Sequence, residues 1–256
     1  NRFIRLMAKF DLSRQEIIFC RGENSKIEVD KLKLDKEALS FPDIACLLPY
    51  KEINISNLSL PEKFISYSPS TVIYSKFVNN DKTEVFYDFQ FKLLSFVNQL
   101  GYSLMLIPHV KRDKNATINN CDYLLCEKIY EKIKNSGQVS MYKGELSASL
   151  AKSIISKSQI HIGARYHTLV ASLSSSTPCV SLSWHHKYLD LFSFYKMKGF
   201  VIDYSNENLF ESLKLKITEI HNNVEQYVNS LKKNHEEVIK LLAENISLFE
   251  NLNKDL

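Results

Sequence analysis

The chain has 256 residues, with 33 lysines and arginines against 29 aspartates and glutamates, so its formal charge is +4. This mild imbalance without a run of five or more basic residues argues against a dedicated nucleic-acid binder, and 45% apolar residues exclude global disorder. The chain holds only 6 glycines, none spaced as in the dinucleotide fingerprint or the P-loop, so a phosphate site must be built in another way.

The N-terminal segment predicts the end of another domain, or an incomplete one, over residues 1–55. Residues 16–20 have the composition of a strand, and a lysine-rich connection separates them from a short apolar segment at 43–48. Residues 51–62 carry asparagine, serine and Pro61, which indicates a linker. We therefore expect a boundary close to residue 55, with a second domain after it.

Between residues 56 and 205, apolar segments of strand length alternate with segments of helical period. We expect Asn79, Asn80 or Asp81 to cap the first helix and Gly101 to follow its end. Such alternation predicts an α/β fold, a Rossmann-like doubly wound parallel sheet. The expected strands are 64–68, 103–107, 138–142, 159–162, 179–182 and 200–202, and the expected helices are 85–100, 123–134, 145–157, 165–175 and 187–196.

Residues 206–256 predict a helical C-terminal tail, because apolar side chains recur every three or four positions. Its polar face mixes glutamate and lysine, which favours packing on the protein itself over a membrane-surface helix. No apolar run approaches the length of a membrane span. The five cysteines lack a C-x-x-C pair and no signal peptide is recognised, so we expect reduced thiols and a cytoplasmic protein.

The sharpest motif is I-H-I-G-A-R-Y-H at residues 160–167, where a predicted strand ends at Gly163 and a helix follows. Ligands of open parallel sheets bind at the carboxyl ends of the strands, and a helix N-terminus there attracts anions. Arg165 and His167 in the first helical turn therefore predict a site for a carboxylate or a phosphate. The alternative is that Arg165 lies on a surface loop and His167 packs in the core.

Further candidates follow other predicted strands. In S-W-H-H-K at 183–187, Trp184 could form an aromatic wall and Lys187 would begin the next helix. We expect at least one of the two histidines between them to be a solvated loop residue, and no metal site, because adjacent histidines face apart on a helix. Arg21 and His109 each follow a strand as well, with an ordinary surface position as the alternative.

These motifs together resemble the polysaccharide pyruvyl transferase family. That family shows G-M/A-R-Y-H, an apolar helix, G-V-P-x-V and then a lysine, where this chain has G-A-R-Y-H at 163–167, T-P-C-V at 177–180 and Lys187. Arg21 with Ser25 resembles its V-R-D-x-x-S element, and P-D-I-A-C-L-L at 42–48 resembles its P-D-P-A-F-L-L. The chain departs from the family pattern at Gly22, Ile44 and Thr177, where an acidic residue, a proline and a glycine are usual.

The resemblance implies a GT-B type fold of two Rossmann-like domains, with residues 56–205 as the C-terminal, donor-binding domain. It implies transfer of pyruvate from phosphoenolpyruvate to a sugar of a cell-surface polysaccharide or its precursor, as a ketal, without a metal or other cofactor. Cations would bind the donor's carboxylate and phosphate, and a general acid would protonate its methylene carbon. The expected catalytic residues are His167, Arg165 and Lys187, and the expected substrate-binding residues are Arg21, Arg165, Lys187, Gly163, His109 and Trp184.

Two other functions stay open from the sequence. One is a GT-B glycosyltransferase, in which the same cations would hold the diphosphate of a nucleotide sugar. The other is an inactive relative that serves as a partner in glycan assembly. The resemblance further implies a sugar or lipid-linked oligosaccharide acceptor, no nucleic-acid partner, and a cytoplasmic location that allows peripheral association with the inner face of the plasma membrane. The acceptor sugar and the oligomeric state stay open.

Overall fold

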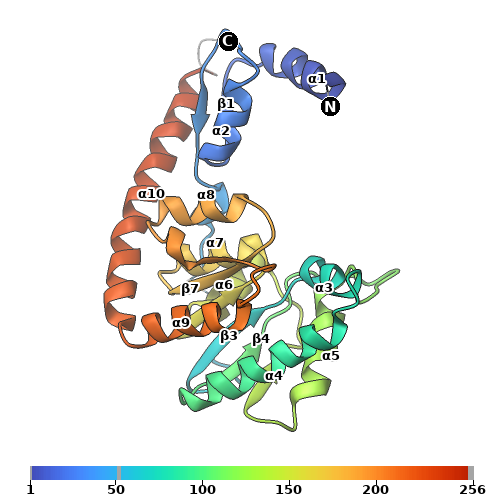
Figure 1. Cartoon of the computed structure of the whole chain (residues 1–256). Coiled ribbons are helices and arrows are strands. Elements are labelled where there is room, and N and C mark those ends of the chain that lie inside the picture. Colours follow the sequence, from blue (N-terminus) through green and yellow to red (C-terminus); the bar gives the residue numbers. More distant parts are fainter. Residues whose placement is uncertain (1, 51–52, 253–256) are drawn as a thin grey trace.

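The computed structural model describes residues 2–50 and 53–252, and within them the main sheet has six parallel strands (Figure 1). The strands lie side by side in the order β5-β4-β3-β6-β7-β8, so the order reverses between β3 and β6. This is the predicted doubly wound arrangement, with its switch point between those two strands. The strands are β3 (Phe64–Ser68), β4 (Ser103–Leu106), β5 (Val139–Met141), β6 (Ile160–Gly163), β7 (Cys179–Ser183) and β8 (Val201–Asp203).

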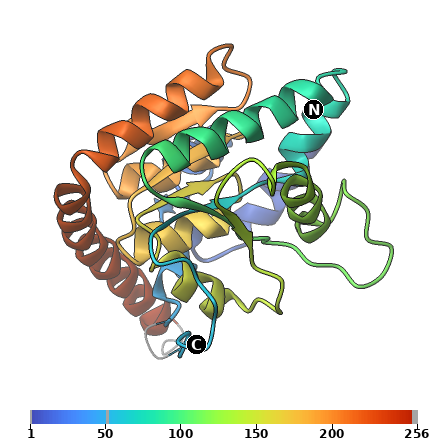
Figure 2. The same ribbon diagram turned by 90° about the horizontal axis from the view of Figure 1, so that it is seen from below.

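Helices cover both faces of this sheet (Figure 2). Helix α4 packs against α5 and α9 on one face, and α6 packs against α7 on the other. Because both faces are covered, β3, β6 and β7 are buried along their whole length, and their sequences are near-continuous apolar or small-residue runs. The helices are α3 (Thr71–Val78), α4 (Thr83–Gln99), α5 (Asp122–Ile133), α6 (Ala148–Ile155), α7 (Tyr166–Ser174), α8 (Lys187–Phe194) and α9 (Leu209–His221).

The segment between β3 and α4 differs from the prediction. A short helix, α3, begins directly after β3 and is capped by the Ser70 hydroxyl, which accepts a hydrogen bond from the Val72 N–H. The expected cap of α4 was wrong, because Asn79–Asp81 form the turn between α3 and α4 and Lys82 precedes α4 without a side-chain cap. At the other end, Gly101 has φ +82 and takes the left-handed position expected of it.

The N-terminal residues contain more regular structure than expected. Helix α1 (Arg2–Ser13) and helix α2 (Glu23–Asp30) were not predicted, nor was strand β2 (Ala38–Ser40), which pairs in parallel with β1 (Ile18–Cys20) apart from the main sheet. The apolar segment that follows is a 3-10 helix, η1 (Ile44–Leu47). The Asp43 carboxylate caps it by accepting a hydrogen bond from the Ala45 N–H.

The predicted helical tail is confirmed and packs on the protein itself. After α9, helix α10 (Val224–Leu252) runs along one side of the molecule toward β1 and β2 (Figure 1). It contacts α7 and η1, and it buries Leu231, Val238 and Leu242. In the described part of the chain, no helix has both the length and the apolar composition needed to cross a membrane.

Candidate active site

The carboxyl ends of β3, β4, β6 and β7 bring most of the predicted site residues together. Arg165 and His167 follow β6, Lys187 follows β7, and His109 follows β4. From the N-terminal part, Arg21 follows β1 and reaches the same place. Residues far apart in the sequence therefore meet at the switch point, where open parallel sheets bind ligands.

Two cations lie over the ring of Tyr166, a buried residue in the first turn of α7. The Arg21 Cζ is 4.4 Å from the centre of that ring, and the Lys187 Nζ is 5.5 Å from it. Lys187 also lies 4.6 Å from the centre of the Trp184 ring, and the aromatic wall expected of Trp184 stays a prediction. Partial burial lowers the pKa of Lys187, and the charges of Arg21 and Arg165 lower it further. Positive charge is therefore concentrated here, held by aromatic faces.

Arg165 is bound by a carboxylate that the sequence analysis missed. Its Nε donates to Asp122 Oδ2 at 2.8 Å and its Nη2 donates to Asp122 Oδ1 at 2.5 Å and to Thr71 Oγ1 at 2.7 Å. The fully buried Asp122 carboxylate also accepts the backbone N–H groups of Thr71 and Val110. Arg165 therefore ties together the segments after β3, β4 and β6, and the surface-loop alternative is wrong. Within the described residues its Nη1 donates no hydrogen bond and stays available.

His167 lies at the surface of this cluster, so the alternative that it packs in the core is wrong. Its side chain is 53% exposed, and its Nε2 is 3.9 Å from Asp43 Oδ2. Its ring stacks on that of His109, with the centres 6.0 Å apart. Partial burial lowers the pKa of His167, the Asp43 carboxylate opposes that shift, and the charges of Arg21 and Lys187 add to it. Partial desolvation also lowers the pKa of His109.

Asp43 is the second carboxylate that the sequence analysis missed. It is buried, and its Oδ2 accepts a hydrogen bond from Arg21 Nη1 at 3.0 Å, while its Oδ1 caps η1. One carboxylate thus orients the guanidinium above Tyr166 and lies beside His167. Its signal in the sequence is its place in the P-D-I-A-C-L-L segment at 42–48, which resembles a P-D-P-A-F-L-L element, and no role in the site was expected of it.

The remaining residues singled out in the sequence are a glycine at the end of β6 and two histidines after β7. A Cβ at Gly163 would lie 2.5 Å from Leu169 side-chain atoms, so this glycine allows α7 to pack closely on β6. A substrate-binding role for it stays a prediction. His185 and His186 are both exposed, as expected of solvated loop residues. Among the residues that the structure describes, no group of three or more histidine, cysteine, aspartate or glutamate side chains could hold a metal ion.

A doubly wound α/β sheet places the protein in the Rossmann-like class, and the arginine, lysine and histidine side chains at its switch point are suited to an anion. The family model for polysaccharide pyruvyl transferase matches residues 1–186, and the chain belongs to that family. None of the curated proteins matches the sequence.

The fold is similar to that of GT-B glycosyltransferases of known structure. Sucrose-phosphate synthase from Thermosynechococcus elongatus is 12% identical, with a TM-score of 0.62, over 100% of this chain and 63% of that one. A UDP-forming α,α-trehalose-phosphate synthase from Burkholderia xenovorans is 11% identical, with a TM-score of 0.60, over 92% of this chain and 61% of that one. The chain thus spans about three fifths of the length of these structures, and the likeness shows the fold alone.

Proposed function

We propose that this protein transfers pyruvate from phosphoenolpyruvate to a sugar of a polysaccharide or its precursor, as a ketal. The observation that carries the proposal is the meeting of Arg21, Lys187 and His167 around Tyr166 at the carboxyl edge of the sheet. The donor bears a carboxylate and a phosphate, and two cations beside a titratable histidine complement it. Membership of the polysaccharide pyruvyl transferase family supports the same chemistry.

Binding of the donor would relieve the repulsion among the cations. Arg21 uses Nη1 for Asp43, which leaves its other N–H groups for an anion. Lys187 makes no ion pair within the described residues, and its lowered pKa reflects burial and the neighbouring positive charges. Arg165 has only Nη1 left and acts mainly by holding the strand ends in place. We therefore assign most of the donor affinity to Arg21 and Lys187.

His167 is the proposed general acid. It would give its proton to the methylene carbon of phosphoenolpyruvate, which makes the neighbouring carbon electrophilic. One sugar hydroxyl then forms a C–O bond to that carbon and returns its proton to the imidazole. The C–O bond to phosphate breaks, the second hydroxyl closes the ketal, and its proton leaves with the phosphate. A bound anion raises the pKa of a nearby histidine, so the donor itself would promote protonation of His167.

The direct test is thermal unfolding with phosphoenolpyruvate, UDP and GDP, together with phosphate release in the presence of sugar acceptors. A ligand at a hundred times its Kd stabilises the native state by about 2.7 kcal/mol. Phosphoenolpyruvate alone should stabilise the wild type. Lys187→Met should abolish this effect, and His167→Asn should keep it while losing turnover. Lys198→Met, a change at an exposed lysine of the 3-10 helix at Lys198–Phe200, is the control.

The other outcomes would refute the proposal. Stabilisation by UDP or GDP in place of phosphoenolpyruvate would identify a glycosyltransferase. No stabilisation by any of the three would favour a relative without this activity.

The proposed acceptor is a polysaccharide or a lipid-linked oligosaccharide, used at the cytoplasmic side of the membrane. The family supports only a sugar acceptor in general.

A further inference from the structure

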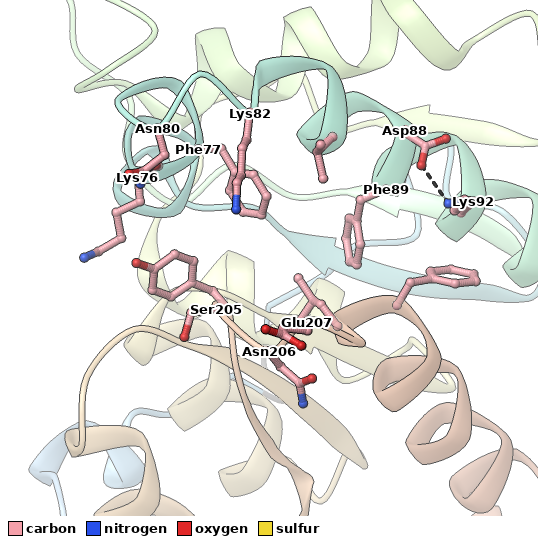
Figure 3. A pocket seen from close by; sticks show the side chains of 14 residues that line it. Lys76, Phe77, Asn80, Lys82, Asp88, Phe89, Lys92, Ser205, Asn206 and Glu207 are labelled. Atoms are coloured by element: carbon pink, nitrogen blue, oxygen red, sulfur yellow. Dashed lines mark hydrogen bonds and ion pairs between the residues drawn. The ribbon is translucent and has the colours of Figure 1, made fainter.

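A pocket lies outside the candidate active site, between α3 and α4 on one side and the loop after β8 on the other (Figure 3). Its volume is about 420 Å³, within the range of about 300–1,000 Å³ that is usual for small-ligand pockets. Residues at the start of α9 complete its lining. None of the residues that line it belongs to the proposed donor site.

Aromatic rings form the apolar part of this pocket. Phe77 and Tyr204 contact each other edge to face with ring centres 6.3 Å apart, and Phe89 and Phe210 do the same at 6.2 Å. Phe77, Tyr204 and Phe210 are only half-buried, so part of each ring stays accessible. Exposed aromatic surface in a concave site is suited to the apolar C–H face of a saturated ring.

The polar groups of the pocket include both hydrogen-bond donors and acceptors. The Lys82 ammonium and the Glu207 carboxylate lie on opposite walls (Figure 3). Both side chains are exposed, and within the described residues neither makes a hydrogen bond or an ion pair. Lys76 also lines the pocket, with its Nζ 5.1 Å from the centre of the Tyr204 ring, and the Glu207 carboxylate would repel a phosphate or a carboxylate. A sugar hydroxyl both donates and accepts, and it can satisfy Lys82 and Glu207 alike.

Both walls of the pocket are joined to the candidate active site. Helix α3 begins at Thr71, whose hydroxyl accepts the hydrogen bond from Arg165, and Phe77 lies six residues further along, about 9 Å at the helical rise of 1.5 Å per residue. On the other wall, the Tyr204 N–H donates to the carbonyl of Ser183, next to Trp184. The pocket therefore adjoins elements that also carry the candidate active site.

We propose that this pocket binds a neutral pyranose of the acceptor glycan, a few sugars away from the one that receives pyruvate. That the bound pyranose belongs to the acceptor glycan rests on the proposed function. The binding of a neutral sugar rests on the aromatic rings and on the free groups of Lys82 and Glu207.

Ligand-observed NMR with maltotriose, cellotriose and β-1,4-mannotriose, without phosphoenolpyruvate, tests this site. The wild type should bind at least one trisaccharide at or below about 10 mM, the range of weak single-site contacts. Glu207→Gln and Lys82→Met should each weaken that binding about tenfold or more, because hydrogen bonds to charged groups are lost. The matched controls are Glu84→Gln and Lys198→Met, which change exposed residues outside the pocket and should leave binding within about twofold.

The same variants separate failure of this site from failure of the proposed function. If trisaccharide binding depends on Glu207 while phosphoenolpyruvate does not stabilise the wild type, the sugar site stands and the pyruvyl transfer fails. If phosphoenolpyruvate binds but no trisaccharide binds, only the sugar site is refuted. The same holds if Glu207→Gln and Lys82→Met bind the trisaccharide as tightly as the wild type does. Competition by inorganic phosphate that is lost in Lys82→Met would also refute it, because it would identify an anion site.

Discussion

Asp122→Asn should destabilise the protein strongly with almost no change in side-chain shape. The carboxylate is fully buried and accepts four N–H groups, two from Arg165 and one each from the backbone of Thr71 and Val110. An amide would turn a donor toward these donors and would remove the counter-charge of Arg165. Breaking a buried ion pair by changing one partner costs about 3–5 kcal/mol. Because the Arg165 side chain is 17% exposed, we expect the lower end of that range.

Urea unfolding followed by circular dichroism measures this loss. The double variant Asp122→Asn/Arg165→Met should lose less stability than the sum of the two single variants, because the residues share their hydrogen bonds. Asp88→Asn is the control, since Asp88 pairs with Lys92 on the exposed face of α4 and such pairs contribute little. If Asp122→Asn costs no more than Asp88→Asn, or if the cycle is additive, this buried pair does not hold the strand ends together.

Two further predictions concern pH. If His167 is the general acid, kcat/KM for phosphoenolpyruvate should fall as the pH rises through the pKa of His167 in the free protein, which lies below 6.5. A value of kcat/KM that stays constant from pH 5 to 8 would exclude that role. Burial lowers the pKa of Lys152 to about 8, against 10.5 in the unfolded chain, so the unfolded chain holds this proton more tightly. The unfolding free energy of the wild type should therefore rise relative to that of Lys152→Met between pH 8 and 10.5. If the unfolding free energies of the two proteins change in parallel with pH, the pKa of Lys152 is not lowered.

The sequence predicted the main sheet because its signals are local. Buried parallel strands are short apolar runs, and here Pro108 and Gly163 mark the ends of two of them. Helix α3 was missed because it has only eight residues and follows β3 after two residues, so no loop separates the two patterns. Strand β2 was missed because three residues in a lysine-rich segment carry almost no periodic signal.

The site was predicted only in part, because its partners are distant in sequence. Arg165, His167 and Lys187 could be found from their positions after strands. Asp122 begins a helix, where acidic residues are common, so nothing distinguishes it until the fold places it against Arg165, 43 residues later. The consequence is functional: Arg165 was expected to bind the donor directly, and the structure assigns most of its hydrogen bonds to Asp122 and Thr71.

Gly22 departs from the family pattern, and its surroundings explain why no acidic residue stands there. It has φ +110, which side chains rarely adopt, and a Cβ would lie 2.4 Å from the Cβ of Asp190. Asp190, in α8, occupies the space that a side chain at position 22 would need. Its Oδ1 accepts two hydrogen bonds from Asn24 at the start of α2. This contact joins α2 to α8 and so places Arg21 near Lys187.

Gly22→Ala and Gly101→Ala form a matched pair that isolates this contact. Both positions have positive φ, but a Cβ at Gly101 would meet nothing within 4 Å. Gly101→Ala should lose about 1–3 kcal/mol of unfolding free energy through backbone strain alone. Gly22→Ala should lose more, and it should also weaken stabilisation by phosphoenolpyruvate, because Asp190 must move and Arg21 moves with α2. If the two variants lose equal unfolding free energy and phosphoenolpyruvate stabilises both as it does the wild type, the contact between α2 and α8 does not position Arg21.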